Sequence, residues 1–343
     1  ETYGNGIVST LSHADPMSRI TGISNSVQAL SYHWDSLGNL NIRTDNTHGL
    51  NETFTYDTLN RLTGAVLTNG SPSSPISTTY SYNALGNITC KSDVVGHDCS
   101  SDPTGYTYGG TAGPHAVTQV TGTSGGTYTY DADGNMTNRN GTAISWNSDN
   151  LPICMDMSDG NCTSSSDYST FSYAPDKHRY QQTAVTGGNT ETTVYVGDYE
   201  AITRNGVTTY RHHLSAYGRE VAEVDLASSG GSVTETDSYI LTDHLGSVDV
   251  VTDQNGNPIA NMSFGAFGKR RDVTQWTAPI GSVETQADHD ADRYGFTHQE
   301  MLDNVSLIHM NGRVYDPNLG RFLSVDPVFE SLAIAEFSLA VCT

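Results

Sequence analysis

Short segments in which aromatic and polar residues alternate recur along the chain, and each ends in the same polar bend. One aromatic residue stands at position i and another at i+2, Asp or Asn follows, Gly or Asn comes three residues later, and an apolar residue closes the segment. The clearest copies are Tyr32–Leu40, Phe54–Leu62, Tyr80–Ile88 and Tyr128–Met136. Because residues i and i+2 lie on one face of a strand, the pattern predicts strands with paired aromatic side chains on one face.

The bend of each segment has the chemistry of a tight hairpin turn. The side chain of Asp35, Asp57 or Asp131 can accept a hydrogen bond from the backbone two residues further on, which starts a type I turn. Gly38 and Gly134 can take the positive φ that a bulged turn requires. The apolar residue that follows begins the return strand and can pack across from the aromatic pair. Each copy is therefore predicted to be a β-hairpin.

The hairpin pattern repeats with a period in the low twenties. The second aromatic residue falls at 34, 56, 82, 108, 130, 146, 173 and 195, so the steps are 22, 26, 26, 22, 16, 27 and 22 residues. A lone hairpin is marginal in water, whereas stacked hairpins bury each other's aromatic faces. The sequence therefore predicts an all-β array of hairpins, with an ordinary antiparallel sandwich as the alternative. The residues that define the repeat are Tyr32, Trp34, Asp35, Gly38, Tyr56, Asp57, Tyr80, Tyr82, Tyr128, Tyr130, Asp131 and Gly134.

Charge narrows the range of partners. The 343 residues include 16 Lys and Arg against 38 Asp and Glu, which gives a formal net charge of −22. Because 16 basic residues cannot neutralise many phosphates, nucleic acids and anionic membrane surfaces are disfavoured as partners. No apolar run reaches the ~18 residues that a membrane span needs. Two explanations of the acidity remain open: solubility of an exported protein, or an acidic inner wall that holds a cationic payload.

Four of the five cysteines form two local pairs in turn-rich segments. Cys90 and Cys99 make one pair, and Cys154 and Cys162 make the other, while Cys342 stands alone. Two loop-closing disulfides are possible if the protein is exported, and free thiols are the equal alternative. The spacings are not those of a zinc site.

Motifs in the last third of the chain resemble the RHS repeat-associated core, and the hairpin pattern resembles the YD repeat of the same RHS/YD-repeat family. The core-like motifs are Thr242–Val248, Phe264–Gly268, Gly295–Glu300, Ile308–Pro317 and Leu319–Pro327. The family includes bacterial polymorphic toxins, C components of insecticidal toxin complexes, and teneurins. The resemblance implies three parts, which are a YD-repeat hairpin array (1–210), a repeat-associated core (211–327) and an atypical tail (328–343).

The resemblance also implies a fold and a function. The hairpins would join into one long β-ribbon that spirals into a shell around a C-terminal toxic domain. The chain would then be a structural shell segment of a bacterial RHS-type polymorphic toxin, secreted or displayed at the cell surface, with no cofactor. Its partners would be the enclosed effector, other shell segments and a secretion or injection component. The alternative is a cell-surface adhesin or carbohydrate-binding module, which would carry an exposed aromatic stripe instead of buried, hydrogen-bonded tyrosines.

In this family the core of many members cleaves itself through aspartates, and two close carboxylates can share a proton so that one acts as acid and the other as base. The resemblance makes Asp326, with Arg321 as its charge partner, the first candidate remnant of such a site. Asp316 is the second candidate. Both aspartates precede proline, so an ordinary turn role is the alternative for each.

The end of the chain departs from the family pattern. Residues 328–343 contain no Asp-Pro-x-Gly and leave no room for an effector, and the chain opens at Glu1 without a signal sequence. We therefore interpret the chain as a C-terminally truncated internal piece and predict neither self-cleavage nor other enzymatic activity. Because the family's shells use longer arrays, we also expect an open strip with free edges, which cannot close a cavity alone.

No metal site is predicted. The segment Asp288–Gln299 resembles a calcium loop at its start, but Arg293 and Gln299 stand where Gly and Glu are needed. His212 and His213 are adjacent, so on a strand they point to opposite faces and are poorly placed to share an ion.

Overall fold

The computed structural model describes residues 1–69, 75–110, 112–157, 160, 162–163, 167–229, 231–273 and 291–326. Almost all regular structure in these residues is antiparallel β-strand, in long arrays of hairpins. The predicted all-β fold class is therefore confirmed. Among the described residues, no helix is long and apolar enough to cross a membrane.

Within the described part of the chain, twenty-three strands form a succession of hairpins, here called the wall. The first sheet contains β1 (Thr10–Ser12), β2 (Gly22–Ser24), β3 (Ala29–Trp34), β4 (Leu40–Asp45), β5 (Leu50–Tyr56), β6 (Leu62–Asn69), β7 (Ile76–Tyr82) and β8 (Ile88–Lys91). After the short helix α1 (Ser92–Val95), the second sheet contains β9 (Tyr106–Tyr108), β10 (Val117–Val120), β11 (Gly126–Tyr130), β12 (Met136–Arg139), β13 (Thr142–Trp146), β14 (Pro152–Asp156), β15 (Tyr168–Tyr173), β16 (Arg179–Thr186), β17 (Asn189–Val196), β18 (Tyr199–Arg204), β19 (Val207–Ala216), β20 (Arg219–Ser229), β21 (Ser232–Thr242), β22 (Val248–Asp253) and β23 (Pro258–Asn261).

Smaller elements follow the wall. They are β24 (Ser263–Phe264), β25 (Arg270–Arg271), the 3₁₀ helices η1 (Phe296–His298) and η2 (Asp303–Val305), and a four-stranded sheet of β26 (Glu300–Leu302), β27 (Leu307–His309), β28 (Val314–Asp316) and β29 (Arg321–Phe322). We call residues 291–326 the core segment. In every sheet of the described residues each strand pairs with its neighbour in sequence, so none of these strands crosses over another.

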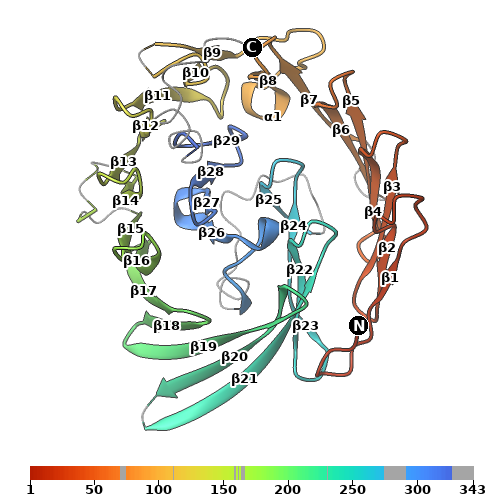
Figure 1. The fold of residues 1–343 in the computed structure, drawn as a ribbon, viewed down its shortest axis with the longest axis vertical. Coiled ribbons are helices and arrows are strands. Elements are labelled where there is room, and N and C mark those ends of the chain that lie inside the picture. The colour runs from red at the N-terminus through yellow and green to blue at the C-terminus, as the bar shows by residue number, and fades with distance from the viewer. Residues whose placement is uncertain are drawn as a thin grey trace.

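The wall bends into a closed ring, and the core segment lies inside it (Figure 1). The N-terminal strands lie beside β22 and β23, at the other end of the wall. Asn5 Nδ2 donates a hydrogen bond to Thr252 Oγ1 (2.9 Å), and Tyr3 and Ile7 pack in one cluster with Leu241 and Val250. The expectation of an open strip is wrong, because side-chain contacts between these hairpins close the ring.

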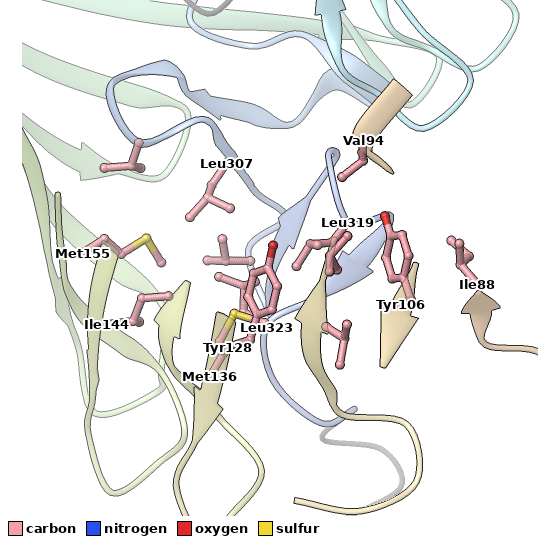
Figure 2. Packing of buried hydrophobic residues seen from close by; sticks show 14 of the residues in the cluster. Ile88, Val94, Tyr106, Tyr128, Met136, Ile144, Met155, Leu307, Leu319 and Leu323 are labelled. Atoms are coloured by element: carbon pink, nitrogen blue, oxygen red, sulfur yellow. The ribbon is translucent and has the colours of Figure 1, made fainter. Parts of the chain in front are cut away.

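The largest hydrophobic cluster joins the wall to the core segment. Figure 2 shows wall residues such as Tyr128, Met136 and Met155 facing Leu307 and Leu323 of the core segment. The backbone N–H of Met136 also donates to the carbonyl of Leu323 at 2.8 Å. A single hairpin layer has no second layer of its own to bury its aromatic face, and the core segment supplies that layer.

The proposed division of the chain at residue 210 falls within β19, in the middle of the second sheet. The three-part organisation stays a prediction. The tail at 328–343 and the start of the calcium-like loop at Asp288 lie outside the described residues.

Candidate functional site

The hairpin turns share one hydrogen-bond arrangement. Asp35 Oδ1 accepts from the N–H groups of Leu37 and Asn39, at 2.9 and 2.8 Å. The same i+2 and i+4 contacts recur in turns headed by Asp57, Asn83, Asp131, Asn147, Asp243 and Asp253. Gly38 and Gly134 have φ of 97° and 83°. The turn is therefore encoded within five residues.

A bulge follows each of these turns at the same place. The register shifts just before the residue that precedes the Asp or Asn of the turn. In the aromatic repeats this is the second aromatic residue, which then faces the apolar residue six positions later. The pairs are Trp34 with Leu40, Tyr56 with Leu62, Tyr82 with Ile88, and Tyr130 with Met136. A bulge increases the local twist of a ribbon, so its recurrence contributes to the curvature that closes the ring.

The two aromatic residues of each repeat have different roles. The first residue is buried on the inner face, as Tyr32, Tyr80 and Tyr128 are. The second residue donates a hydrogen bond to a main-chain carbonyl of an earlier strand or, for Trp34, of the segment just before β2. These bonds run from Trp34 to Ile20 (2.8 Å), Tyr56 to Leu40 (2.7 Å), Tyr82 to Leu62 (2.8 Å), Tyr108 to Ile88 (2.5 Å), Tyr130 to Val117 (2.9 Å) and Trp146 to Met136 (2.8 Å). The repeat aromatics thus tie successive hairpins together.

At the ring closure, repeat aromatics of the first hairpins contact the turn after β21. The rings of Tyr32 and His244 have centroids 4.2 Å apart, and Trp34 contacts the same imidazole edge-on at 5.8 Å. Gln28 Nε2 donates to Asp249 Oδ2 at 2.6 Å. Burial raises the pKa of Asp249 to about 7, even though the Gln28 bond opposes that rise. We call these contacts the seam.

A network of buried charges joins β16–β20 to the core segment. Arg293 forms an ion pair with Glu200, donates to Thr193 Oγ1 at 2.8 Å, and lies 3.3 Å from Glu300 Oε1. Arg179 also pairs with Glu300. Since removal of one member would leave a buried charge without its partner, the network fixes the position of the core segment against this part of the wall.

One histidine lies at the edge of this network. His213 Nδ1 is 2.6 Å from Glu220 Oε1 and 3.4 Å from Glu223 Oε1, and His213 Nε2 is 3.4 Å from Glu200 Oε1. Burial disfavours the charged imidazole, but Glu200 and Glu220 outweigh that effect and raise the pKa of His213 to about 10. Burial raises the pKa of the Glu223 carboxyl well above its usual value, against the opposing charge of Arg211.

The candidate self-cleavage residues lie in the core segment. Asp316 is buried, and its Oδ2 accepts from Arg139 Nε of β12 at 2.5 Å. Asp326 forms an ion pair with Arg313 at 2.9 Å. Arg321 donates to Tyr108 Oη (3.2 Å) and to the carbonyl of His115 (2.6 Å).

These contacts connect the three candidates to different parts of the protein. Asp316 and Asp326 are bound by different arginines, and Arg321 anchors β29 to the loop before β10. The arrangement offers a structural role for each of them. The loss of self-cleavage in this chain stays a prediction.

Both local cysteine pairs are disulfide-bonded in the structure. Cys90 and Cys99 join β8 to the loop after α1, and Cys154 and Cys162 join β14 to the loop that follows it. Each disulfide closes a short loop between residues 9 or 8 positions apart.

Sequence reasoning missed the buried charges of the wall. Glu191, Glu200, Arg211 and Glu223 are all buried on the inner face, opposite exposed outer residues. The available signal was the placement of charged residues at alternate positions of strands, which usually marks a solvated face. The face that this pattern would place in solvent is covered by the core segment. The sequence of β16–β20 alone does not reveal this cover.

Comparison with known proteins agrees with this geometry. Residues 233–338 match the family described as Teneurin YD-shell. A search of curated proteins finds no match. Among solved structures, the chain is similar to the TcdB2-TccC3-TEV crystal structure, with 18% identity, a TM-score of 0.72, and coverage of 96% of this chain and 17% of that one.

A second solved structure also matches nearly the whole chain at low sequence identity. The Tc holotoxin pore of Photorhabdus luminescens with a TccC3 mutation matches with 16% identity and a TM-score of 0.69, over 95% of this chain and 17% of that one. This chain therefore spans about a sixth of the length of the structures that it matches. The chain thus carries a Teneurin YD-shell match over residues 233–338 and shares its fold with parts of these two toxin-complex structures.

Proposed function

We propose that this domain is a structural segment of an RHS-type toxin shell that encapsulates and helps deliver a C-terminal effector. The observation that carries the proposal is the set of hydrogen bonds from the second repeat aromatics to preceding strands, for example from Tyr82 to Leu62 and from Tyr130 to Val117. These side chains are used to build a wall, so they are not free to stack on a ligand. The core segment inside the ring is the part of the chain that leads toward any C-terminal effector.

The same proposal specifies location and partners. The toxin complexes that this chain resembles in fold associate several protein components. We propose that the domain is exported from a bacterium, and that it contacts other shell segments, the effector and an injection component. Two disulfides and a net charge of −22 fit an exported protein.

A protease-protection experiment tests encapsulation. A protease-sensitive reporter is fused after Thr343, and in the matched control it is fused before Glu1. Shell enclosure of C-terminal cargo predicts that the C-terminal fusion is cut more slowly than the control, and that the difference disappears when the domain is unfolded by denaturant. Equal cleavage of both fusions in the folded protein would contradict the encapsulating role.

One surface favours the alternative function of an adhesin or carbohydrate-binding module. Tyr210 lies in a cross-strand row between Ala201 and Leu226 on the outer face, and its side chain is exposed. On the same face Tyr199 is exposed and stacks on His212 with ring centroids 4.1 Å apart. Exposed rings can stack on sugars or on a protein partner. Glycan-array binding that is lost in Tyr210→Ser but kept in Tyr82→Phe would support this alternative.

A further inference from the structure

Three possible metal ligands converge at the closed end of the β19–β20 hairpin. His213 of β19 lies directly opposite Glu223 of β20. Glu220 and Glu223 are three positions apart, and on a regular strand such residues point to opposite faces. Here Leu214 pairs with Ala222 and Ser215 pairs with Glu220, so Val221 forms a bulge. The bulge therefore turns Glu220 to the same side as His213 and Glu223.

The distances between these side chains are close to those around a bound metal ion. Ligand atoms of His213, Glu220 and Glu223 all lie within 4.8 Å of one another. His213 Nδ1 is 3.4 Å from Glu223 Oε1 and 2.6 Å from Glu220 Oε1. Metal–ligand bonds of about 2.0–2.2 Å in a tetrahedron place neighbouring ligand atoms about 3.3 Å apart. One contact already fits, and the other requires a small rotation of Glu220.

Glu223 provides an independent sign that this group takes a cation. Its side chain is fully buried, and neither carboxylate oxygen forms a hydrogen bond within the described residues. Its charged neighbours are Arg211 Nη1, 3.2 Å from Oε2, and His213 Nδ1, 3.4 Å from Oε1. Buried carboxylates normally accept several hydrogen bonds or bind a metal, because leaving the oxygens unsatisfied is costly.

The surroundings would orient the ligands. His213 Nε2 faces Glu200 Oε1 at 3.4 Å, and His298 Nε2 lies 2.9 Å from Glu220 Oε2. A histidine that binds a metal through one nitrogen commonly donates its other N–H to a carboxylate, and such supporting contacts fix the ring.

Both acidic and basic side chains surround this group. Near the three side chains stand the arginines Arg211 and Arg293 and the acids Glu200, Asp225 and Asp292. With Glu220 and Glu223 included, five carboxylates therefore face two guanidinium groups and the imidazoles of His213 and His298. A divalent cation would bind here in exchange for protons of the ligand groups.

We propose that His213, Glu220 and Glu223 form a binding site for a divalent transition-metal ion. One imidazole nitrogen with two carboxylates suits Zn²⁺ and similar ions, whereas Ca²⁺ and Mg²⁺ prefer oxygen ligands alone. The ion would clamp the β19–β20 hairpin beneath the core segment, next to the Arg293 network. This site departs from the expectation of no metal, which considered His213 only with its neighbour His212.

Titration of the metal-free full chain with Zn²⁺ tests the site. We expect one high-affinity ion per chain with a dissociation constant of about 1 μM or lower, a higher unfolding temperature with Zn²⁺, and no comparable effect of Ca²⁺ or Mg²⁺. Because ligands lose protons when the metal binds, the binding enthalpy should change with the ionisation enthalpy of the buffer. Absence of saturable Zn²⁺ binding would overturn the proposal.

Variants assign the ligands. His213→Gln and Glu223→Gln should each weaken Zn²⁺ binding by more than about 100-fold, and Glu200→Gln by about 10- to 100-fold. The matched control is His48→Gln, which removes another histidine 2.6 Å from a carboxylate, Asp45, and should leave binding unchanged. Equal affinity in His213→Gln and the unaltered chain would refute the assignment.

X-ray absorption of the zinc-loaded unaltered chain supplies a test that needs no variant. One imidazole nitrogen and otherwise oxygen ligands at about 2.0–2.2 Å are expected. Sulfur ligands, or two or more imidazoles, would contradict the site even if every variant failed to fold.

Discussion

Arg139 of the wall and Asp316 of the core segment, 177 residues apart in sequence, form a buried ion pair with 2.5 Å between Nε and Oδ2. Arg139 also donates to the carbonyl of Val305 at 3.3 Å, and Asp316 Oδ1 accepts the N–H groups of Asn318 and Leu319. This pair therefore links a hairpin of the ring directly to the turn that connects β28 with β29.

The first prediction concerns this ion pair. Asp316→Asn should destabilise the domain by about 3–5 kcal/mol, because Arg139 would remain buried without its counter-charge. Chemical denaturation of Asp316→Asn, Arg139→Gln and the double variant measures the coupling. The double variant should lose clearly less than the sum of the two single changes. Strict additivity would show that the pair does not hold the core segment to the wall.

The second prediction concerns the hydrogen bonds between hairpins. Tyr130→Phe removes the bond from Tyr130 Oη to the Val117 carbonyl and should cost about 0.5–1.5 kcal/mol of unfolding free energy. Tyr210→Phe is the matched control, since its side chain is exposed on the outer face, and it should change stability by less than about 0.5 kcal/mol. Equal effects of the two substitutions would mean that the Tyr130 bond contributes little.

The third prediction separates backbone strain from packing in the hairpin turns. Gly134 and Gly86 have nearly the same φ, 83° and 82°, but a Cβ on Gly134 would lie 2.9 Å from Val325 Cγ2, whereas a Cβ on Gly86 would meet nothing within 4 Å. Gly86→Ala should cost about 1–2 kcal/mol from the left-handed backbone alone. Thermal unfolding should show a larger loss for Gly134→Ala, and the opposite order would be inconsistent with the packing of Val325 on this turn.

The fourth prediction is a pH dependence at the seam. Burial raises the pKa of Asp249 from 3.8 to about 7, so the folded state holds a proton that the unfolded state releases at lower pH. The contribution of Asp249 to stability is therefore present below pH 4 and is lost as the pH rises to about 7, by about 4 kcal/mol in all. The difference in unfolding free energy between Asp249→Asn and the unaltered chain, measured from pH 4 to 8, isolates this effect. A difference that does not vary with pH would show that Asp249 titrates normally.

The fifth prediction concerns the disulfide between Cys90 and Cys99. Both side chains are buried, and the bridge closes a loop with a sequence separation of 9 residues. Replacing both cysteines by alanine should cost about 2–3 kcal/mol, mainly through the greater freedom of the unfolded chain. Peptide mapping without reduction should recover the Cys90–Cys99 pair. Recovery of both residues as free thiols from oxidised protein would contradict the pairing.

How far the fold follows from sequence depends on the range of the interactions. The hairpin pattern at Tyr32–Leu40 and Tyr128–Met136 was predictable, because the turn, the bulge and the aromatic pair are all determined within nine residues. The pairing of each strand with the next follows from the same short connections. Whether the cysteines form disulfides could not be predicted from the sequence, since their spacing fits both free thiols and bridges.

The closed ring and the charged inner face were not predictable in this way. Closure depends on the small twists of all the hairpins of the wall added together. A small error in the twist expected for each hairpin therefore changes whether Asn5 meets Thr252. The face that buries Glu223 and Arg211 would be solvated if the core segment did not cover it. The pairing of Asp316 with Arg139 is equally set by where the core segment lies.

The sequence by itself therefore determined the repeating unit, since its turn bonds and aromatic packing act between residues close in the chain. Only the tertiary structure decided that the ribbon closes around its own C-terminal segment, and which buried charges meet there. Contacts such as Asn5 with Thr252 and Arg139 with Asp316 join residues 247 and 177 positions apart, and their geometry depends on the curvature of the whole wall, which no local pattern specifies.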